Sequence, residues 1–328
     1  MNSLLQCFYH IKGLRSCFID PNNYSKEEQK VCYSLSEVMK GLEFGGQNCY
    51  SPKNFKKTLG KINPLFSGNK VADVIDLYRT IVDSIINEIP YEYPEDEEDE
   101  NDDGDNTNKM KYYINAKKEL DENNPIIKEL NYFFETIYYC PKGNKCYSIQ
   151  SDTSIMFDLL KISKWANNDN INLKNCFEYN FRIIQKNEFY CSKCECNHKN
   201  KSQDKIISLP KELTMILNRG KGKKKFFNKI NFYEIINIQK YVDDEFIEPK
   251  NRKYNYRLIG VSTYKQSNSD NGHYYAYCYI ESENKYYCFN DTRVTQAQFE
   301  DLNDEVPYIL FYEQIDDRNY ENNKIETL

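Results

Sequence analysis

Apolar residues recur at helical spacing in two stretches near the start of the chain. The first stretch follows Asn2 and Ser3, two residue types that favour a helix N-terminus, and it consists of Leu4, Leu5, Cys7, Phe8 and Ile11. In the second, Asp73 and Asp76 accompany an apolar stripe that comprises Val71, Val74, Ile75, Tyr78, Ile81, Val82 and Ile85. The pattern predicts two amphipathic helices, the first of them buried, in a largely helical N-terminal part.

From Tyr112 onward the apolar pattern changes to short runs that are typical of β-strands. Valine, isoleucine, tyrosine and phenylalanine are frequent in these runs, and asparagine, aspartate, serine and glutamate separate them. The predicted strands cover residues 133–139, 154–160, 189–190, 208–217, 256–263, 272–280, 285–289 and 306–312. We expect an antiparallel sheet in which consecutive strands are neighbours, and therefore an α+β fold.

Composition is compatible with one large domain or two modest ones. The 328 residues are 40% hydrophobic, which is enough for a sizeable core. No apolar run approaches the roughly 18 residues that a membrane-spanning helix needs, so we expect a soluble protein without a signal peptide. Twelve cysteines spread thinly through a chain of this size indicate reduced thiols, and hence the cytoplasm and/or the nucleus.

Charge is concentrated in two runs. Ten acidic residues and no basic one lie between Glu92 and Asp105, in a chain whose net charge is -6. Such a tract repels itself and has little to bury, which predicts a disordered insertion and favours a solvated loop over a docking motif. The basic run from Arg219 to Lys225 lacks the interleaved aromatic residues of a nucleic-acid site, so it indicates a solvated hairpin tip.

One of the three histidines stands out as candidate chemistry. His273 follows Gly272 at a predicted strand start, where glycine permits close backbone approach, and Asn290 and Asp291 follow seventeen and eighteen residues later, after a turn. Two adjacent strands would bring one of these side chains beside the imidazole. A histidine oriented by Asn or Asp is two of the three parts of a nucleophilic catalytic triad. The alternative is an ordinary hydrogen-bonded histidine of a sheet.

Several motifs in a fixed order resemble the ubiquitin-specific proteases. Residues 258–263, 272–274, 287–291 and 307–312 together are similar to the histidine box of that family. Residues 209–219 resemble its "LP..L.I.LKRF" strand, with Gly220 where phenylalanine is usual, and Met1 to Phe8 (MNSLLQCF) resembles the latter part of its cysteine box, "NTCYMNSxLQxL". The resemblance covers nearly the whole chain.

This resemblance implies a papain-like cysteine protease hand, with a helical thumb, a β-rich palm and β fingers that grip ubiquitin. It predicts a single catalytic domain over 1–328, with the thumb in 1–91, the acidic insertion in 92–110, fingers and palm in 112–318 and a tail in 319–328. The implied partners are ubiquitin or ubiquitinated proteins, with no nucleic acid and no membrane.

By resemblance, His273 is the general base, Asn290 the orienting third residue and Asp291 an adjacent acidic residue that supports catalysis. An amide accepts the imidazole N–H and fixes its direction. The nucleophilic cysteine and the oxyanion-stabilising asparagine of the family motif would both precede Met1, and Cys7 lies too far along the first helix to replace the thiol. We expect that Met1 is an internal methionine of an active enzyme to which the start codon was wrongly assigned. The alternative is a true truncation that leaves a pseudoenzyme.

The resemblance also predicts residues that bind the ubiquitin tail. Asp73 and Asp76 match the acidic positions of the family's "QDAxEF" helix and would contact the arginines of the tail, whereas the alternative makes them stabilising first-turn acids of a surface helix. Gly272 and Tyr274 flank the histidine and are further candidates for substrate binding.

Four cysteines match the two halves of the family's finger-tip zinc ribbon. Cys191 and Cys194 form a CxxC motif, whereas Cys140 and Cys146 are separated by five residues. Four thiolates bind zinc tetrahedrally, so the alternatives are a structural zinc site and a metal-free finger, with Cys196 and His198 as substitute ligands. Catalysis itself requires no cofactor.

Three functions remain from the sequence. The first is a cysteine-type deubiquitinase that hydrolyses (iso)peptide bonds at the ubiquitin C-terminus, although the chain from Met1 lacks its nucleophile. The second is a catalytically inactive ubiquitin-binding pseudoenzyme, and the third, with less support, is a zinc-ribbon adaptor.

Overall fold

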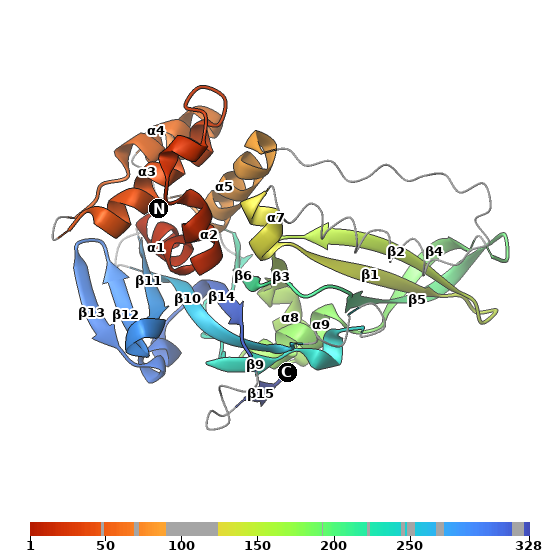
Figure 1. Ribbon diagram of the computed structural model, residues 1–328. Coiled ribbons are helices and arrows are strands. Elements are labelled where there is room, and N and C mark those ends of the chain that lie inside the picture. Colours follow the sequence, from red (N-terminus) through yellow and green to blue (C-terminus); the bar gives the residue numbers. More distant parts are fainter. Residues whose placement is uncertain are drawn as a thin grey trace.

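The computed structural model describes residues 1–46, 49–68, 72–89, 124–191, 193–221, 224–243, 247, 253–266, 272–316 and 325–328. Helices from the N-terminal part cover one face of a large sheet, and a second, smaller sheet extends away from it (Figure 1). The acidic tract 92–110 lies outside the described residues. Within the part described, no helix combines the length and apolarity needed to cross a membrane.

The N-terminal part is helical, as the sequence predicts. Its elements are α1 Asn2–His10, α2 Lys12–Phe18, η1 Pro21–Asn23, α3 Lys30–Phe44, α4 Lys53–Ile62, η2 Pro64–Phe66 and α5 Val74–Glu88. The helix predicted from Val71 begins at Val74, because the side chain of Asp73 accepts a hydrogen bond from the backbone N–H of Ile75 (2.8 Å) and caps it. Val71 itself lies outside the described residues.

The large sheet has the strand order β13-β12-β11-β10-β14-β6-β3, and β9 joins it beside β10. Its strands are β3 Ile155–Asp158, β6 Glu212–Asn218, β9 Ile235–Asn237, β10 Asn255–Gln266, β11 Gly272–Ile280, β12 Lys285–Asn290, β13 Arg293–Ala297 and β14 Pro307–Gln314. Consecutive strands are neighbours from β10 to β13, but the prediction is wrong for β14, which pairs with β10 and β6. The first six residues of β14 are buried whereas β13 is mostly exposed, so only a central position buries both faces of β14.

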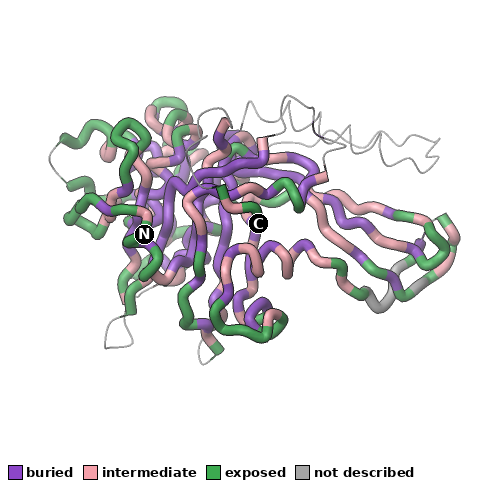
Figure 2. Tube along the Cα trace, turned by 90° about the horizontal axis from the view of Figure 1, so that it is seen from below, coloured by how far each residue is buried: buried purple, intermediate pink, exposed green. Residues whose placement is uncertain are grey.

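Alternate side chains of the large sheet face two separate cores. In β14, Ile309 and Phe311 pack with α1 to α5, whereas Leu310 and Tyr312 pack in the core on the opposite face. That second core includes α8 Leu159–Ala166 and α9 Leu173–Asn180, which the strand-like pattern did not predict. The strand expected over 154–160 ends at Asp158, whose side chain caps α8 by accepting from the N–H of Lys161 (3.2 Å). Figure 2 shows the buried residues concentrated in this central region.

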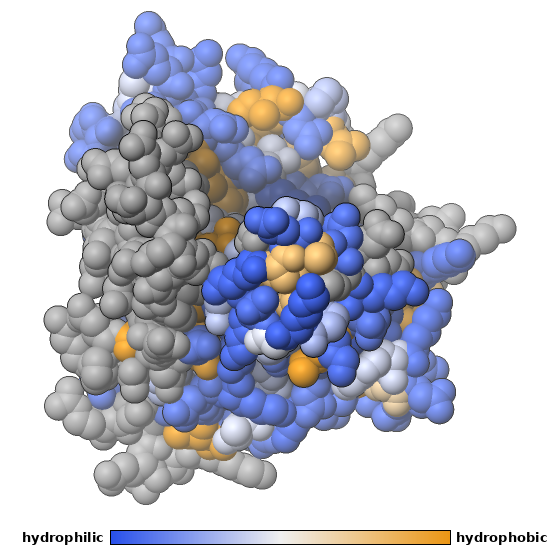
Figure 3. Space-filling view, turned by 90° about the vertical axis from the view of Figure 1, so that its right-hand side faces the viewer, coloured by the Kyte–Doolittle hydropathy of each residue, from blue (hydrophilic) through white to orange (hydrophobic). Residues whose placement is uncertain are grey.

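The smaller sheet has the order β2-β1-β5-β4 and follows the short helix α7 Pro125–Leu130. Its strands are β1 Tyr132–Tyr139, β2 Lys145–Asp152, β4 Ile184–Cys191 and β5 Cys196–Ile206. β5 carries few apolar residues, which explains why its sequence gave no strand signal. The surface at this end of the molecule is largely hydrophilic (Figure 3).

The remaining elements are short. They are β7 Gly220–Lys221, β8 Lys224–Lys225, η3 Gln239–Tyr241, η6 Glu281–Glu283, η7 Phe299–Asp304 and β15 Glu326–Thr327. β15 pairs in parallel with β9 and the Leu328 side chain is buried, so the end of the expected tail returns to the large sheet.

In the basic run at 219–225, β7 and β8 pair antiparallel, while the expected solvated tip at 222–223 lies outside the described residues. The first residue of the run is not solvated. Arg219 is 1% exposed. Its Nε donates to the carbonyl of Pro307 (2.9 Å) and its Nη1 to that of Asn228 (2.8 Å), so the guanidinium ties the hairpin to β14. Burial lowers the pKa of Arg219 to about 10.

The contact between α5 and α3 gives a test of the helical part. Glu88 accepts hydrogen bonds from the backbone N–H groups of Val31 (2.8 Å) and Cys32 (2.9 Å) at the start of α3. We expect Glu88→Ala to lower the free energy of unfolding by about 1–2 kcal/mol, the usual cost of a lost helix cap, as measured by urea denaturation. The exposed Glu27→Ala is the matched control and should change it by less than about 0.5 kcal/mol. Equal effects of the two changes would contradict this role for Glu88.

Candidate active site

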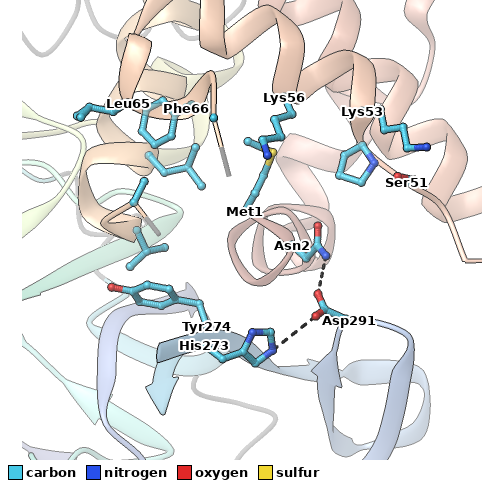
Figure 4. Close-up of a pocket in the computed structure, with 15 residues that line it drawn as sticks. Met1, Asn2, Ser51, Lys53, Lys56, Leu65, Phe66, His273, Tyr274 and Asp291 are labelled. Carbon is cyan, nitrogen blue, oxygen red and sulfur yellow. Dashed lines mark hydrogen bonds and ion pairs between the residues drawn. The ribbon is translucent and has the colours of Figure 1, made fainter. Parts of the chain in front are cut away.

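A cleft of about 570 Å³ opens where the N-terminus of α1 faces the start of β11 (Figure 4). One wall comes from α4 and η2, with Lys53, Lys56 and Leu65, and the other contains His273 and Tyr274. Packing of α1 on the sheet fixes this arrangement. The hydroxyl of Ser262 in β10 donates to that of Ser3 (3.2 Å), and the apolar face of α1 is buried against β10 and β11.

The structure brings His273 and Asn290 together as the sequence predicts. Nε2 of His273 lies 2.7 Å from Oδ1 of Asn290 and 3.6 Å from Oδ2 of Asp291. With the amide oxygen as acceptor, Nε2 carries the proton and Nδ1 of the neutral ring keeps its lone pair. The imidazole is about half exposed (47%), so it is accessible from the cleft and its direction is held by Asn290.

Asp291 lies at the turn between β12 and β13, and it also contacts α1. Oδ1 of Asp291 accepts a hydrogen bond from Nδ2 of Asn2 (2.6 Å), as Figure 4 shows. The backbone φ of Asp291 is +52°, a left-handed conformation that aspartate and asparagine tolerate better than most residues. Asn2 therefore links the helix N-terminus to the turn that carries Asn290 and Asp291. The sequence did not predict this role of Asn2, because the pattern of apolar and polar residues does not show that Asn2 and Asp291 are in contact.

The ring of Tyr264 lies against Gly272, next to the histidine, so that a side chain at position 272 would require the ring to move. A Cβ on Gly272 would lie 1.9 Å from the Tyr264 ring. That ring packs against Tyr274 (centroids 4.8 Å apart) and Tyr308 (5.7 Å). Glycine at position 272 is thus required by close approach, as the sequence suggested.

Asp73 and Asp76 lie at the start of α5, where Ala72, Val74 and Leu77 line the cleft. Asp73 caps the helix, and both carboxylates are half-buried. Tyr274 lies close enough to Asp73 that burial, and then this negative charge, raise the pKa of the phenol. Contact of the two acids with a substrate stays a prediction.

The cleft around His273 is lined by no cysteine among the described residues. Cys7 points into the core, 1% exposed, as the helical spacing predicts. His10, also in α1, is half-buried. Its Nδ1 lies 2.8 Å from the carbonyl of Gln6, and burial lowers the pKa of its imidazole to about 4.

The four cysteines predicted as zinc ligands meet at the end of the smaller sheet. Sγ of Cys140 is 3.7 Å from Sγ of Cys194, and Sγ of Cys146 is 3.6 Å from Sγ of Cys191. Four sulfurs at about 2.3 Å from a zinc ion form a tetrahedron with edges of about 3.8 Å. The register between β1 and β2, with Tyr138 opposite Cys146, explains why five intervening residues still bring both thiols to one place.

The chemistry of these thiols also fits a metal. Burial opposes ionisation of these thiols. Hydrogen bonds from Cys194, Cys146 and Cys140 lower the pKa of Cys191, whereas burial and the contacts with Cys191 and Cys140 raise the pKa of Cys194. Cys191 is therefore the first of the group to form a thiolate, the form that binds zinc. Cys196 instead donates to the carbonyl of Cys194 (3.0 Å), and the side chain of His198 is outside the described part. The cluster could therefore hold a structural zinc ion.

A family model and several known proteins are similar to this chain in sequence. A family model described as ubiquitin carboxyl-terminal hydrolase matches residues 1–312. Ubiquitin carboxyl-terminal hydrolase 17-like protein B of Mus musculus is 28% identical over 137 residues, which are 41% of this chain and 28% of that protein. Putative ubiquitin carboxyl-terminal hydrolase 11 of Arabidopsis thaliana is 29% identical over 188 residues, 53% of this chain and 20% of that protein. The chain thus matches less than a third of the length of either relative.

Solved structures show the same fold at low sequence identity. The SAGA DUB module Ubp8/Sgf11/Sus1/Sgf73 bound to monoubiquitin contains a chain that matches with a TM-score of 0.72 at 20% identity, over 96% of this chain and 66% of that one. The same module bound to ubiquitin aldehyde gives a TM-score of 0.70 at 19% identity, over 96% and 67%. These matches confirm the predicted α+β fold.

The close contact between Gly272 and Tyr264 gives a test of the cleft wall. We expect Gly272→Ala to cost about 1–3 kcal/mol of stability, as overpacking does, because the Tyr264 ring must leave its contacts with Tyr274 and Tyr308. Adding Tyr264→Ala should remove much of this extra cost, which a double-mutant cycle in urea measures. Additive effects of the two changes would contradict the contact.

Metal binding tests the cysteine cluster. The protein should bind one Co²⁺ or Zn²⁺ ion per chain, with the visible absorption bands of tetrahedral thiolate-bound Co²⁺. Cys194→Ser should weaken or abolish this binding, whereas Cys196→Ser, which changes a thiol two residues away, should leave it intact. Loss of the ion in the Cys196 variant alone would assign the ligands differently.

Proposed function

Because the chain belongs to the ubiquitin carboxyl-terminal hydrolase family, we propose that it is the catalytic domain of a cysteine-type deubiquitinase. It would hydrolyse peptide or isopeptide bonds at the C-terminus of ubiquitin. The observation that carries the proposal is the 2.7 Å contact between His273 Nε2 and Asn290 Oδ1 in a cleft beside a helix N-terminus. A base held in one direction beside such a helix is suited to thiol catalysis.

In the proposed reaction a cysteine thiolate adds to the carbonyl carbon of the terminal glycine of ubiquitin. The protonated His273 gives its proton to the departing lysine amine as the carbon–nitrogen bond breaks, which leaves an acyl thioester. His273 then removes a proton from water, and the hydroxide releases ubiquitin and the thiol. Asn290 keeps the ring in place, and the Asp291 carboxylate lies 3.6 Å from Nε2.

The proposed reaction needs a thiol at the N-terminus of α1. Met1 and Asn2 line the cleft at the start of α1, so a cysteine just before them would lie at the helix N-terminus, where the dipole favours a thiolate. The second candidate is a protein that binds ubiquitin without cleaving it, and it is favoured by the lack of a cysteine among the described residues that line the cleft.

Substrate contacts in this proposal divide between the cleft walls. The ubiquitin tail would run past Tyr274 and Gly272 toward His273, with its arginines near Asp73 and Asp76. Two of the solved structures with this fold are complexes with monoubiquitin or ubiquitin aldehyde, which supports ubiquitin as the partner. We propose a cytoplasmic and/or nuclear location, because thiols scattered through a large core are typical of reducing compartments.

A ubiquitin probe with a C-terminal electrophile tests the proposal on the full-length protein. We expect a covalent adduct at a cysteine beside the N-terminus of α1, and His273→Ala should slow its formation by about 10²-fold or more, the usual contribution of a general base. Ubiquitin binding measured by calorimetry should survive that substitution, which shows that the variant is folded.

The outcomes separate the two candidates. Binding without any adduct would replace the enzyme with a ubiquitin-binding protein. Neither binding nor adduct would refute both.

A further inference from the structure

The cleft does not end at His273. Beyond Asp291 it continues into a second pocket of about 220 Å³ that lies between α1, α3 and the turn of β12 and β13. The two cavities share Asn2, Ser51, Pro52 and Asp291. A chain passing His273 from the side of Tyr274 would therefore reach this pocket next.

The second pocket combines an apolar floor with a polar rim. Leu5, Val38, Leu42 and Phe289 provide the apolar surface, while Gln6 and Thr292 add polar groups. Such a lining suits a side chain with an apolar stem and a polar end, since the stem gains from burial and the end keeps hydrogen-bonding partners.

Charge differs between the two ends of the cleft. At the acidic end, Asp73 and Asp76 lie at the start of α5 beside the lining residues Ala72, Val74 and Leu77, and the Asp291 carboxylate lies where the two cavities meet. Lys53 and Lys56 of α4 line the cleft together with Ser51 and Pro52, which belong to both cavities. Lys53 is exposed and Lys56 half-buried. An arginine-bearing ubiquitin tail would favour the acidic end, so the basic end is left for the other product of the reaction.

We propose that this second pocket is the site for the leaving group, and that it selects acceptor lysines flanked by acidic residues. The inference rests on the proposed function, because only a reaction at His273 gives the pocket a substrate on that side. The alkyl stem of the acceptor lysine packs on the apolar floor. The carboxylates of its neighbours lie toward Lys53 and Lys56.

The test uses ubiquitin joined to the lysine of a short peptide through a bond that is not hydrolysed. Two peptides differ only in the residues beside the lysine, which are glutamate in one and lysine in the other. At low salt we expect the acidic conjugate to bind more tightly than the basic one, by about threefold for each charge pair. The difference should shrink as salt is added.

Charge reversal assigns the preference to the basic end. The double variant Lys53→Glu/Lys56→Glu should abolish or invert the preference between the two conjugates, with each affinity expressed relative to that of the same variant for ubiquitin alone. The double variant Lys57→Glu/Lys61→Glu makes the same charge change on the same helix at residues that line neither cavity. It should keep the preference.

Cys49 provides a second readout, because it lines the second pocket and is exposed whereas the other cysteines are buried or half-buried. Its alkylation by a small thiol reagent should be slowed by the conjugates but not by ubiquitin alone. If ubiquitin does not bind at all, the proposed function fails. If ubiquitin binds, but the two conjugates bind equally and neither slows the alkylation of Cys49, the leaving-group site is refuted. The proposed function then stands.

Discussion

The packing of α1 on β10 and β11 is the contact on which the cleft depends. Leu4, Leu5 and Phe8 are all at most 2% exposed, and burying each such side chain is worth about 1.5–3 kcal/mol. Phe8 meets Tyr78 of α5 and Phe311 of β14 edge to face, so one residue joins the helix to both its neighbours. This apolar face sets the rotation of α1 about its own axis, and hence the direction in which Asn2 projects.

The turn between β12 and β13 is the second fixed point, and its conformation is coupled to the helix. Asp291 has a positive φ and accepts from Asn2, while its neighbour Asn290 orients His273. A short turn at the edge of a sheet would otherwise be among its more mobile parts. The hydrogen bond to α1 restrains it, so the imidazole is held by two elements that are far apart in the chain. Catalytic groups held in this way need little reorganisation when a substrate binds.

Local pattern was sufficient to predict the elements whose side chains separate cleanly into apolar and polar faces. It identified α1, α5 and most strands of the large sheet, and the family resemblance paired His273 with Asn290 correctly. It failed for β5, because its strand carries few apolar residues, and for α8, because its apolar residues continue those of β3 without a break. It also failed for the position of β14, since the order of strands along the chain does not determine which strands pair with each other. Asn2, Lys53 and Lys56 could not be found from the sequence, because they reach the cleft only through tertiary packing.

The far end of the smaller sheet raises a different problem, because among the described residues few apolar side chains are buried there beyond those of β1. Phe133 and Ile207 are the buried members of the sheet's apolar cluster, and Tyr147 and Ile149 only partly cover them. The far end is held instead by Cys140, Cys146 and Cys191, which are buried with Cys194 at their side. A part of a sheet with too little core is stabilised by a cross-link, and four thiolates around one ion would supply that cross-link in the reducing surroundings proposed here, where disulfides do not persist. The cysteine cluster is therefore best understood as the substitute for a core in this sheet, with a mechanical role that is independent of the chemistry at His273.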